Sequence, residues 1–247
     1  METGMLKIWN ATNFRRTLGG LCLIVAPLLH FATEHLIGVG NNRTASDWLA
    51  TATQHHDGLV EATYLDILSG ILLIPAFFAI LHVVRGRGVI LAHIGVALAL
   101  VGVVLWTFVQ SGASLMVGVM GSPGLDSGAM TALIQKSLIN ASPASAPFFG
   151  LFLVELGYVL VGLAVWRSGF GYRWAGPLIS ISVVAVIFNP LQSDLSDAVI
   201  DALIVVGLAA IGLRMLLMPD SAWDSAPGSA DKPAARAVPH AEHVVGS

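Results

Sequence analysis

Six long runs of predominantly apolar residues dominate this chain. They are residues 17–38, 59–84, 89–110, 147–166, 174–190 and 196–218. A helix needs about 20 such residues to cross the hydrocarbon core of a bilayer. Backbone groups in lipid must be hydrogen-bonded within their own segment, so each run is expected to be a helix. We predict an all-α, polytopic transmembrane bundle of six helices, of which the fifth is the shortest.

The composition agrees with this prediction. Hydrophobic residues make up 55% of the 247 residues and charged residues only 11%, against about 25% charged in an ordinary soluble domain. The net charge is -3, and the few basic residues are scattered rather than gathered into a patch, so no nucleic-acid partner is expected. Cys22 is the single cysteine and therefore forms no disulfide within the chain.

The distribution of lysine and arginine sets the expected orientation, because cytoplasmic connections are enriched in these residues. Threading the six runs alternately from an inside N-terminus leaves only Arg43 and Lys136, of 12 basic residues, on the outside. We therefore predict a multi-pass protein of the cell (inner) membrane with both termini cytoplasmic. Its parts are a cytoplasmic or interfacial N-terminus (1–16), a transmembrane domain (17–218) and a disordered cytoplasmic tail (219–247).

Two long connections, residues 39–58 and 111–146, fall on the outside. In the first, Thr44 or Ser46 is placed to cap a short helix that Trp48 and Leu49 hold on the surface. The second is expected to form a turn, a short interfacial helix and a breaker. Long loops carry function more often than short ones, so these segments are also the expected docking surface of any protein partner.

Ionisable side chains inside the apolar runs gather in the outer half of the predicted bundle. His30 and Glu34 are four residues apart and share one helical stripe. Other acidic residues at similar depth are Asp57, Glu61, Asp66, Asp194, Asp197 and Asp201, with Glu155 nearer the middle of its run. Because charge facing lipid is costly, we expect an outward-opening polar vestibule walled by the first, second and sixth helices, with Glu155 at its floor.

A surface explanation suits the four acidic residues closest to the predicted boundary, Asp57, Glu61, Asp194 and Asp197, which can be solvated helix ends. The deeper residues are the candidate site. Glu34 and Asp66 are the expected catalytic or proton-handling pair, because a carboxylic acid in an apolar pocket can hold its proton at neutral pH. The expected ligand-binding residues are His30, Glu155 and Asp201.

Histidines raise two cofactor alternatives, and the sequence identifies no cofactor. His30, Glu34 and His35 are possible metal ligands, but five residues of α-helix place the two imidazoles about 140° apart, which makes a poor chelate. His82 and His93 fall at similar depth near the cytoplasmic face, as a bis-histidine haem would require. Neither of their runs shows a glycine-lined slot for a porphyrin.

The segments "RRTLGGLCLIVAPLLHF" and "ATYLDILSGILLIPAFFAILHVVRGRG", separated by a polar outer loop, resemble small six-helix bacterial integral membrane proteins of unknown function. The resemblance covers about the first half of the chain. It implies the six-helix fold and carries no activity or catalytic residue with it.

These patterns favour a vestibule that binds a small molecule or cation, in a carrier or in a membrane-embedded enzyme that acts on a lipophilic substrate. Two alternatives remain open: a non-catalytic membrane subunit that docks a partner through its outer loops, and a bis-histidine haem protein. The expected partners are membrane lipid and a small-molecule or cation ligand.

Overall fold

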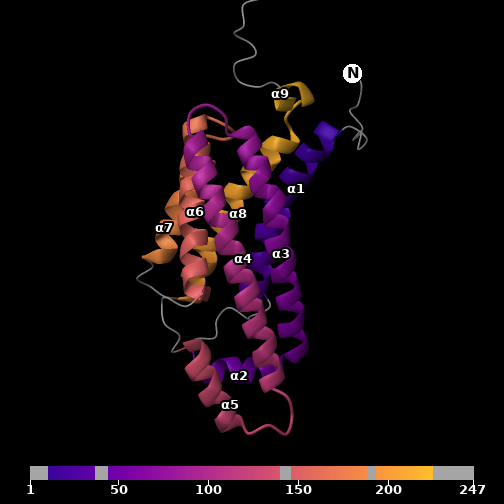
Figure 1. The fold of residues 1–247 in the computed structure, drawn as a ribbon, viewed down its shortest axis with the longest axis vertical. Helices are drawn as coiled ribbons and strands as arrows, with labels where there is room; N and C mark the ends of the chain where they lie inside the picture. Colours follow the sequence, from indigo (N-terminus) through magenta and orange to yellow (C-terminus); the bar gives the residue numbers. More distant parts are fainter. Residues whose placement is uncertain (1–10, 37–43, 140–145, 189–192, 225–247) are drawn as a thin grey trace, which may run out of the picture.

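The computed structural model describes residues 11–36, 44–139, 146–188 and 193–224, and all regular structure in them is helical. Figure 1 shows the arrangement of the helices. The five long helices are α1 (Ala11–Phe31), α3 (His56–Val83), α4 (Val89–Met120), α6 (Ala146–Ser168) and α8 (Asp194–Leu216). Shorter elements are α2 (Ala45–Gln54), α5 (Ser127–Ile134), α7 (Ala175–Ile187), α9 (Asp220–Asp224) and the π-helical turns η1 (Ala32–Leu36) and η2 (Gln135–Ile139).

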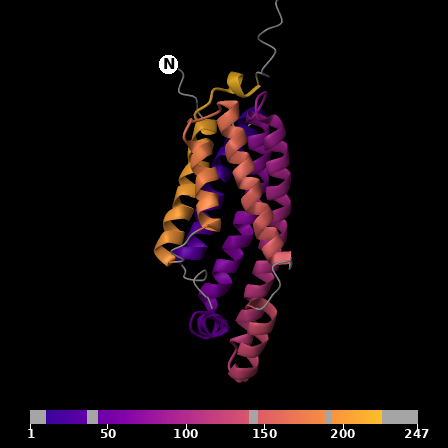
Figure 2. The same cartoon turned by 90° about the vertical axis from the view of Figure 1, so that its left-hand side faces the viewer.

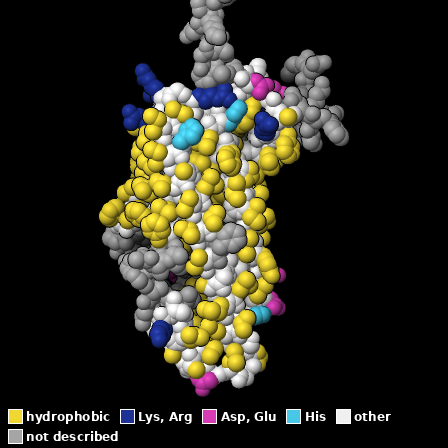
Figure 3. Space-filling view, viewed as in Figure 1, with side chains coloured by type: hydrophobic (Ala, Val, Ile, Leu, Met, Phe, Trp, Pro, Cys, Tyr) yellow, Lys and Arg dark blue, Asp and Glu magenta, His cyan; other side chains and the backbone are white. Residues whose placement is uncertain are grey.

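The described residues contain five helices long and apolar enough to cross a membrane. The predicted fifth crossing corresponds to α7, whose 13 residues span only about 20 Å at about 1.5 Å per residue. Large apolar side chains point outward along the bundle, for example Phe78 (58% exposed) and Ile181 (67% exposed), and Figure 3 shows hydrophobic side chains over most of its flank. An apolar outer surface of this extent indicates a membrane protein.

Small residues let the helices approach closely, as is usual where lipid replaces water. In the α4–α6 contact, a Cβ added at Gly157 would lie 2.6 Å from the backbone nitrogen of Ala99. Gly95 faces the same helix, so the small-residue pair Gly95 and Ala99 is internal to the bundle. Gly20 and Gly212 form the equivalent contact between α1 and α8.

α4 continues to Met120, ten residues beyond the predicted end at Gln110. Residues 111–120 are mostly apolar. The predicted helix ended at Gln110 because residues 89–110 are already long enough to cross the membrane once. This extension supports a second small core with α2 and α5, built from Ala45, Leu49, Ala52, Leu59, Val117, Met120 and Ile134. The predicted helix after Thr44 is confirmed: Thr44 accepts from the backbone of Asp47, and the Asp47 carboxylate accepts from the backbone N–H of Thr44. Figure 2 shows the α2 and α5 end projecting past α7 and α8.

The two ends of the described chain meet at the opposite end of the bundle. Arg16 of α1 forms a 2.9 Å ion pair with Asp220 of α9, and the Trp223 indole is buried and stacks on the His82 imidazole. Residues 220–224 are therefore ordered, unlike the predicted disordered tail from 219. The physical reason is the large aromatic side chain of Trp223, which packs against His82 at the end of α3. Residues 225–247 of that tail lie outside the described residues.

The end of α1 departs from regular α-helix. Pro27 lacks the N–H that would donate to the preceding turn, and residues 32–36 form the wider π-helical turn η1. Thr33 donates its hydroxyl to the His30 carbonyl at 2.7 Å. Proline and π-helical turns are common causes of local distortion, and π-turns occur often at functional sites. His30 lies in α1, whereas Glu34 and His35 lie in η1, so their angular spacing differs from that of a regular α-helix.

Candidate functional site

A cavity of about 160 Å³ lies within the bundle, lined by all six of the helices α1, α3, α4, α6, α7 and α8. Most of its wall is apolar, with Pro27, Leu73, Val154 and Leu208 among the lining residues. A cavity of about 150 Å³ in another protein is large enough to hold benzene. This space, called the central cavity below, therefore has the size and lining of a site for a small, largely apolar molecule.

A histidine–aspartate pair lies at the wall of the central cavity. His30 Nδ1 of α1 and Asp66 Oδ1 of α3 are 2.9 Å apart, and Asp66 is 15% exposed while His30 is 43% exposed. The other ring nitrogen of His30, Nε2, has no protein partner among the described residues. An aspartate on one imidazole nitrogen fixes the tautomer and leaves the other nitrogen to exchange protons or bind a ligand. The Asp66 carboxylate thus fixes the orientation of the His30 imidazole.

A second histidine–aspartate pair joins the same distorted helix end to α8. His35 Nε2 and Asp201 Oδ2 are 2.8 Å apart. The His35 ring also packs against Phe31, with 4.8 Å between the ring centroids. Asp201 lines the central cavity but His35 does not. The two pairs together connect the end of α1 to both of its neighbours, α3 and α8.

Glu155 and Tyr158 of α6 also line the central cavity. Glu155 is half-buried and has no hydrogen-bond or ion-pair partner in the described part of the chain. Ser69 and Thr107 also line the cavity, but the Ser69 hydroxyl already donates to the Ala26 carbonyl at 2.8 Å. An unpaired carboxyl group among apolar walls is costly unless water, a proton or a ligand compensates it.

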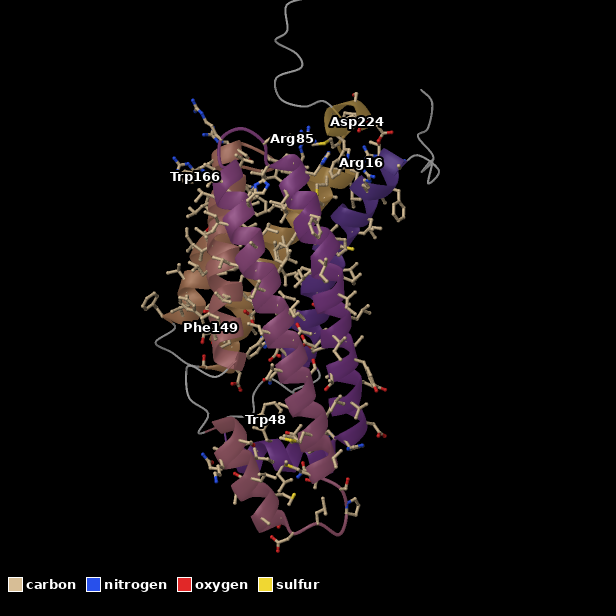
Figure 4. All side chains as sticks on the ribbon, in the orientation of Figure 1. Arg16, Trp48, Arg85, Phe149, Trp166 and Asp224 are labelled. Atoms are coloured by element: carbon tan, nitrogen blue, oxygen red, sulfur yellow. The ribbon has the colours of Figure 1, made fainter. Side chains whose placement is uncertain are left out.

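A second cavity of about 140 Å³ adjoins the first on the side of α2 and is called the outer cavity below. Asp66 and Trp106 line both cavities. Its wall is more polar than that of the central cavity. Further lining residues are Thr33, Glu34, Trp48, Thr63, Gln110, Ser111 and Ser114. Figure 4 shows Trp48 on α2, at the end of the bundle remote from Arg16 and Arg85.

The structure brings four of the five predicted site residues to one cavity: His30, Asp66, Glu155 and Asp201. Glu34 lines the adjoining outer cavity instead. Asp57, Glu61 and Asp194 are exposed, as the surface explanation expects, and Asp197 is half-buried. No group of three or more histidine, cysteine, aspartate or glutamate side chains in the described ranges is close enough to hold a metal ion. The possible ligands His30 and His35 bond to separate aspartates instead.

His82 and His93, the alternative histidine pair, have separate contacts in the structure. His82 stacks on Trp223, with ring centroids 4.2 Å apart, and its side chain also contacts Arg85. His93 lies exposed on α4, where its Nδ1 is 2.8 Å from the Val89 carbonyl. Each imidazole thus has its own partners, and the arrangement gives no support to a porphyrin held between them.

Several lining residues were missed from the sequence. Tyr158 and Trp106 resembled ordinary apolar packing residues, and nothing local marks them as cavity residues. Gln110, Ser111 and Ser114 carried a detectable signal: three polar side chains on neighbouring turns of an otherwise apolar run. The predicted helix ended at Gln110, so Ser111 and Ser114 fell in the predicted outer connection.

No family model, no curated protein and no solved structure matches this chain.

Proposed function

We propose that this chain is a six-pass protein of the inner membrane with both termini in the cytoplasm. Two observations support the proposal. The described ends of the chain meet at one end of the bundle through Arg16 and Asp220, as expected for an even number of passes with α7 as the short one. Basic residues also gather at that end, in the α3–α4 and α6–α7 turns and near the end of α8, as expected for a cytoplasmic face.

We further propose that the protein is a carrier that binds a small molecule in the outer half of the membrane. The observation that carries this proposal is the central cavity, where ionisable groups from four helices line an otherwise apolar space. Asp201 lies 13 residues along α8 from Arg214, about 20 Å from the basic end at 1.5 Å per residue. Ionisable groups at such depth mark substrate or proton pathways more often than they serve the scaffold.

Proton exchange is the chemistry that this arrangement supports best. His30 Nε2 and the Glu155 carboxyl group can each gain or lose a proton without breaking a protein hydrogen bond. Protonation of His30 strengthens its contact with Asp66, while loss of that proton weakens it. Because the two histidine–aspartate pairs hold the end of α1 against α3 and α8, proton and ligand binding would both bias how these helices meet.

A second candidate is a membrane-embedded enzyme that acts on a lipophilic substrate. The specific observation in its favour is the orientation of His30 by Asp66, with Nε2 left without a protein partner in the described ranges. This is the arrangement of a general base or acid, for which proximity to the reacting proton is the first requirement. The apolar cavity would exclude bulk water from the reaction.

Both candidates require a bound molecule, so identification of that molecule is the first experiment. We expect mass spectrometry of the purified full-length protein to find a small molecule enriched over a His30→Ala/Glu155→Gln double variant purified in equal yield. In vesicles with a pH gradient, a carrier accumulates this molecule and Glu34→Gln abolishes accumulation. Product formation in detergent without a gradient indicates the enzyme. If both preparations give identical small-molecule profiles, the binding proposal is wrong.

A further inference from the structure

The outer cavity contains polar groups that have no partner among the described residues. Ser111 is 4% exposed, and its Oγ has no hydrogen-bond partner in the part of the chain that the structure describes. Hydroxyls inside helices usually bond back to their own helix, as Thr63 does at 2.8 Å to the Leu59 carbonyl. Ser111, which lines the outer cavity, makes no such bond within the described residues. A buried hydroxyl without a partner costs about 1–3 kcal/mol, which a bound polar group would recover.

Two more oxygen-bearing side chains line this cavity, and both are half-buried. Glu34 of η1 and Gln110 of α4 have no hydrogen-bond or ion-pair partner among the described residues. Glu34 brings a carboxyl group, and Gln110 and Ser111 each bring a neutral oxygen acceptor. Three oxygen acceptors around one space match the three N–H donors of a primary ammonium group. The unpaired carboxylate supplies the countercharge.

Aromatic side chains line the same space. Trp48 comes from α2 and Trp106 from α4, and both are half-buried. Tryptophan faces attract organic cations more strongly than those of tyrosine or phenylalanine. A carboxylate with two tryptophans therefore favours a cationic ligand over an anionic or a neutral one.

Asp66 and Trp106 line both this polar space and the apolar central cavity, so the two cavities adjoin each other. We infer that the ligand is an amphipathic primary amine, with its ammonium group between Glu34, Gln110 and Ser111 and its apolar body in the central cavity. This inference rests on the proposed function, because it assigns a chemical class to the molecule bound there. It also gives Glu34 and Glu155 different roles: Glu34 contacts the ammonium group, whereas Glu155 lies beside the apolar body.

The test uses a matched pair of probes, 2-phenylethylammonium and 2-phenylethanol, which share a benzene-sized body and differ in the head group. Binding is measured by titration calorimetry on the full-length protein in lipid nanodiscs. We expect the ammonium probe to bind at least ~10-fold more tightly than the alcohol, as for a charge-assisted contact worth about 1.4 kcal/mol. Glu34→Gln should remove this preference and leave the alcohol affinity unchanged. Glu61→Gln, which changes an exposed carboxylate on α3, should preserve the preference.

Trp48→Leu provides a second variant outside the long helices, and it should lower the ammonium affinity without changing the alcohol affinity. Equal binding of both probes to the unmodified protein would overturn the inference and leave the proposed function standing. A preference that survives Glu34→Gln would also overturn it, even if Glu155→Gln removes that preference. If neither probe binds, the inference and the central cavity as a small-molecule site are both wrong.

Discussion

Replacement of Gly157 by leucine is expected to prevent stable folding of the bundle. A Cβ at this position would lie 2.6 Å from the backbone nitrogen and 2.7 Å from the Cβ of Ala99 on α4. Backbone atoms cannot rotate away as a flexible side chain can, so α4 and α6 would have to separate. A single extra methylene in a tight core costs about 1–3 kcal/mol, and leucine adds several, in a contact made by close backbone approach.

The chain offers a matched control for this substitution. Gly112 lies on α4, and a Cβ there would meet nothing within 4 Å. Leucine favours helix over glycine by up to about 1 kcal/mol, so Gly112→Leu should leave thermal stability unchanged or slightly raised. The measurement is the fraction of monodisperse protein left after heating in detergent. If Gly112→Leu is as damaging as Gly157→Leu, close packing of α4 on α6 is not the cause.

Asp66→Asn is expected to lower uptake or turnover of the co-purifying molecule by about 100-fold or more, the usual contribution of positioned acid–base groups. Its effect on stability should be small, because hydrogen bonds between membrane helices are worth about 0.6 kcal/mol on average. Asparagine also retains an oxygen that can accept from His30 Nδ1. What it lacks is the charge that stabilises a protonated imidazole, so function should suffer far more than folding.

Asp57→Asn is the control, since it makes the same change at an exposed position on α3. It should leave both rate and melting temperature near those of the unmodified protein. A melting temperature for Asp66→Asn more than about 5 °C below the control would correspond to more than 1 kcal/mol in a chain of this size. Such a drop without any loss of rate would make the His30–Asp66 pair a structural contact rather than a functional one.

The helices were predictable because their signal is local. Runs of apolar residues identify the long helices, and the Thr44 capping box depends on residues three apart. The end of α4 after Gln110 was not predictable from span length, because it packs against α2 and α5. Trp223 illustrates the same limit: one aromatic residue in a polar tail gains order only from the end of α3 against which it packs.

The candidate site was also predictable only in part. Spacing and depth identified His30, Asp66, Glu155 and Asp201 as unusual residues, because buried ionisable groups are conspicuous in apolar runs. The pairing of each histidine with an aspartate depends on which helices are neighbours and on the π-turn after Phe31. Hydrophobic periodicity predicts neither of these features. Of the outer cavity, only Glu34 and Asp66 were predicted as site residues, because serine and glutamine near the end of an apolar run look like ordinary interfacial residues.

The central claim is that water and solutes reach the central cavity from the outside. It is tested most directly by thiol labelling of single-cysteine variants on a Cys22→Ser background, which removes the only native cysteine. A thiol reacts only as its thiolate, so it must be in contact with water. Thr107→Cys reports on the central cavity, and Phe78→Cys reports on an outward apolar face of α3. Arg87→Cys reports on the α3–α4 turn.

A small cationic thiol reagent that does not cross membranes is added to intact spheroplasts. We expect it to modify Thr107→Cys, to spare Phe78→Cys, and to reach Arg87→Cys only after the membrane is made permeable. Labelling of Arg87→Cys in intact spheroplasts, or of Thr107→Cys only after permeabilisation, would contradict an outward-opening cavity with the basic end inside.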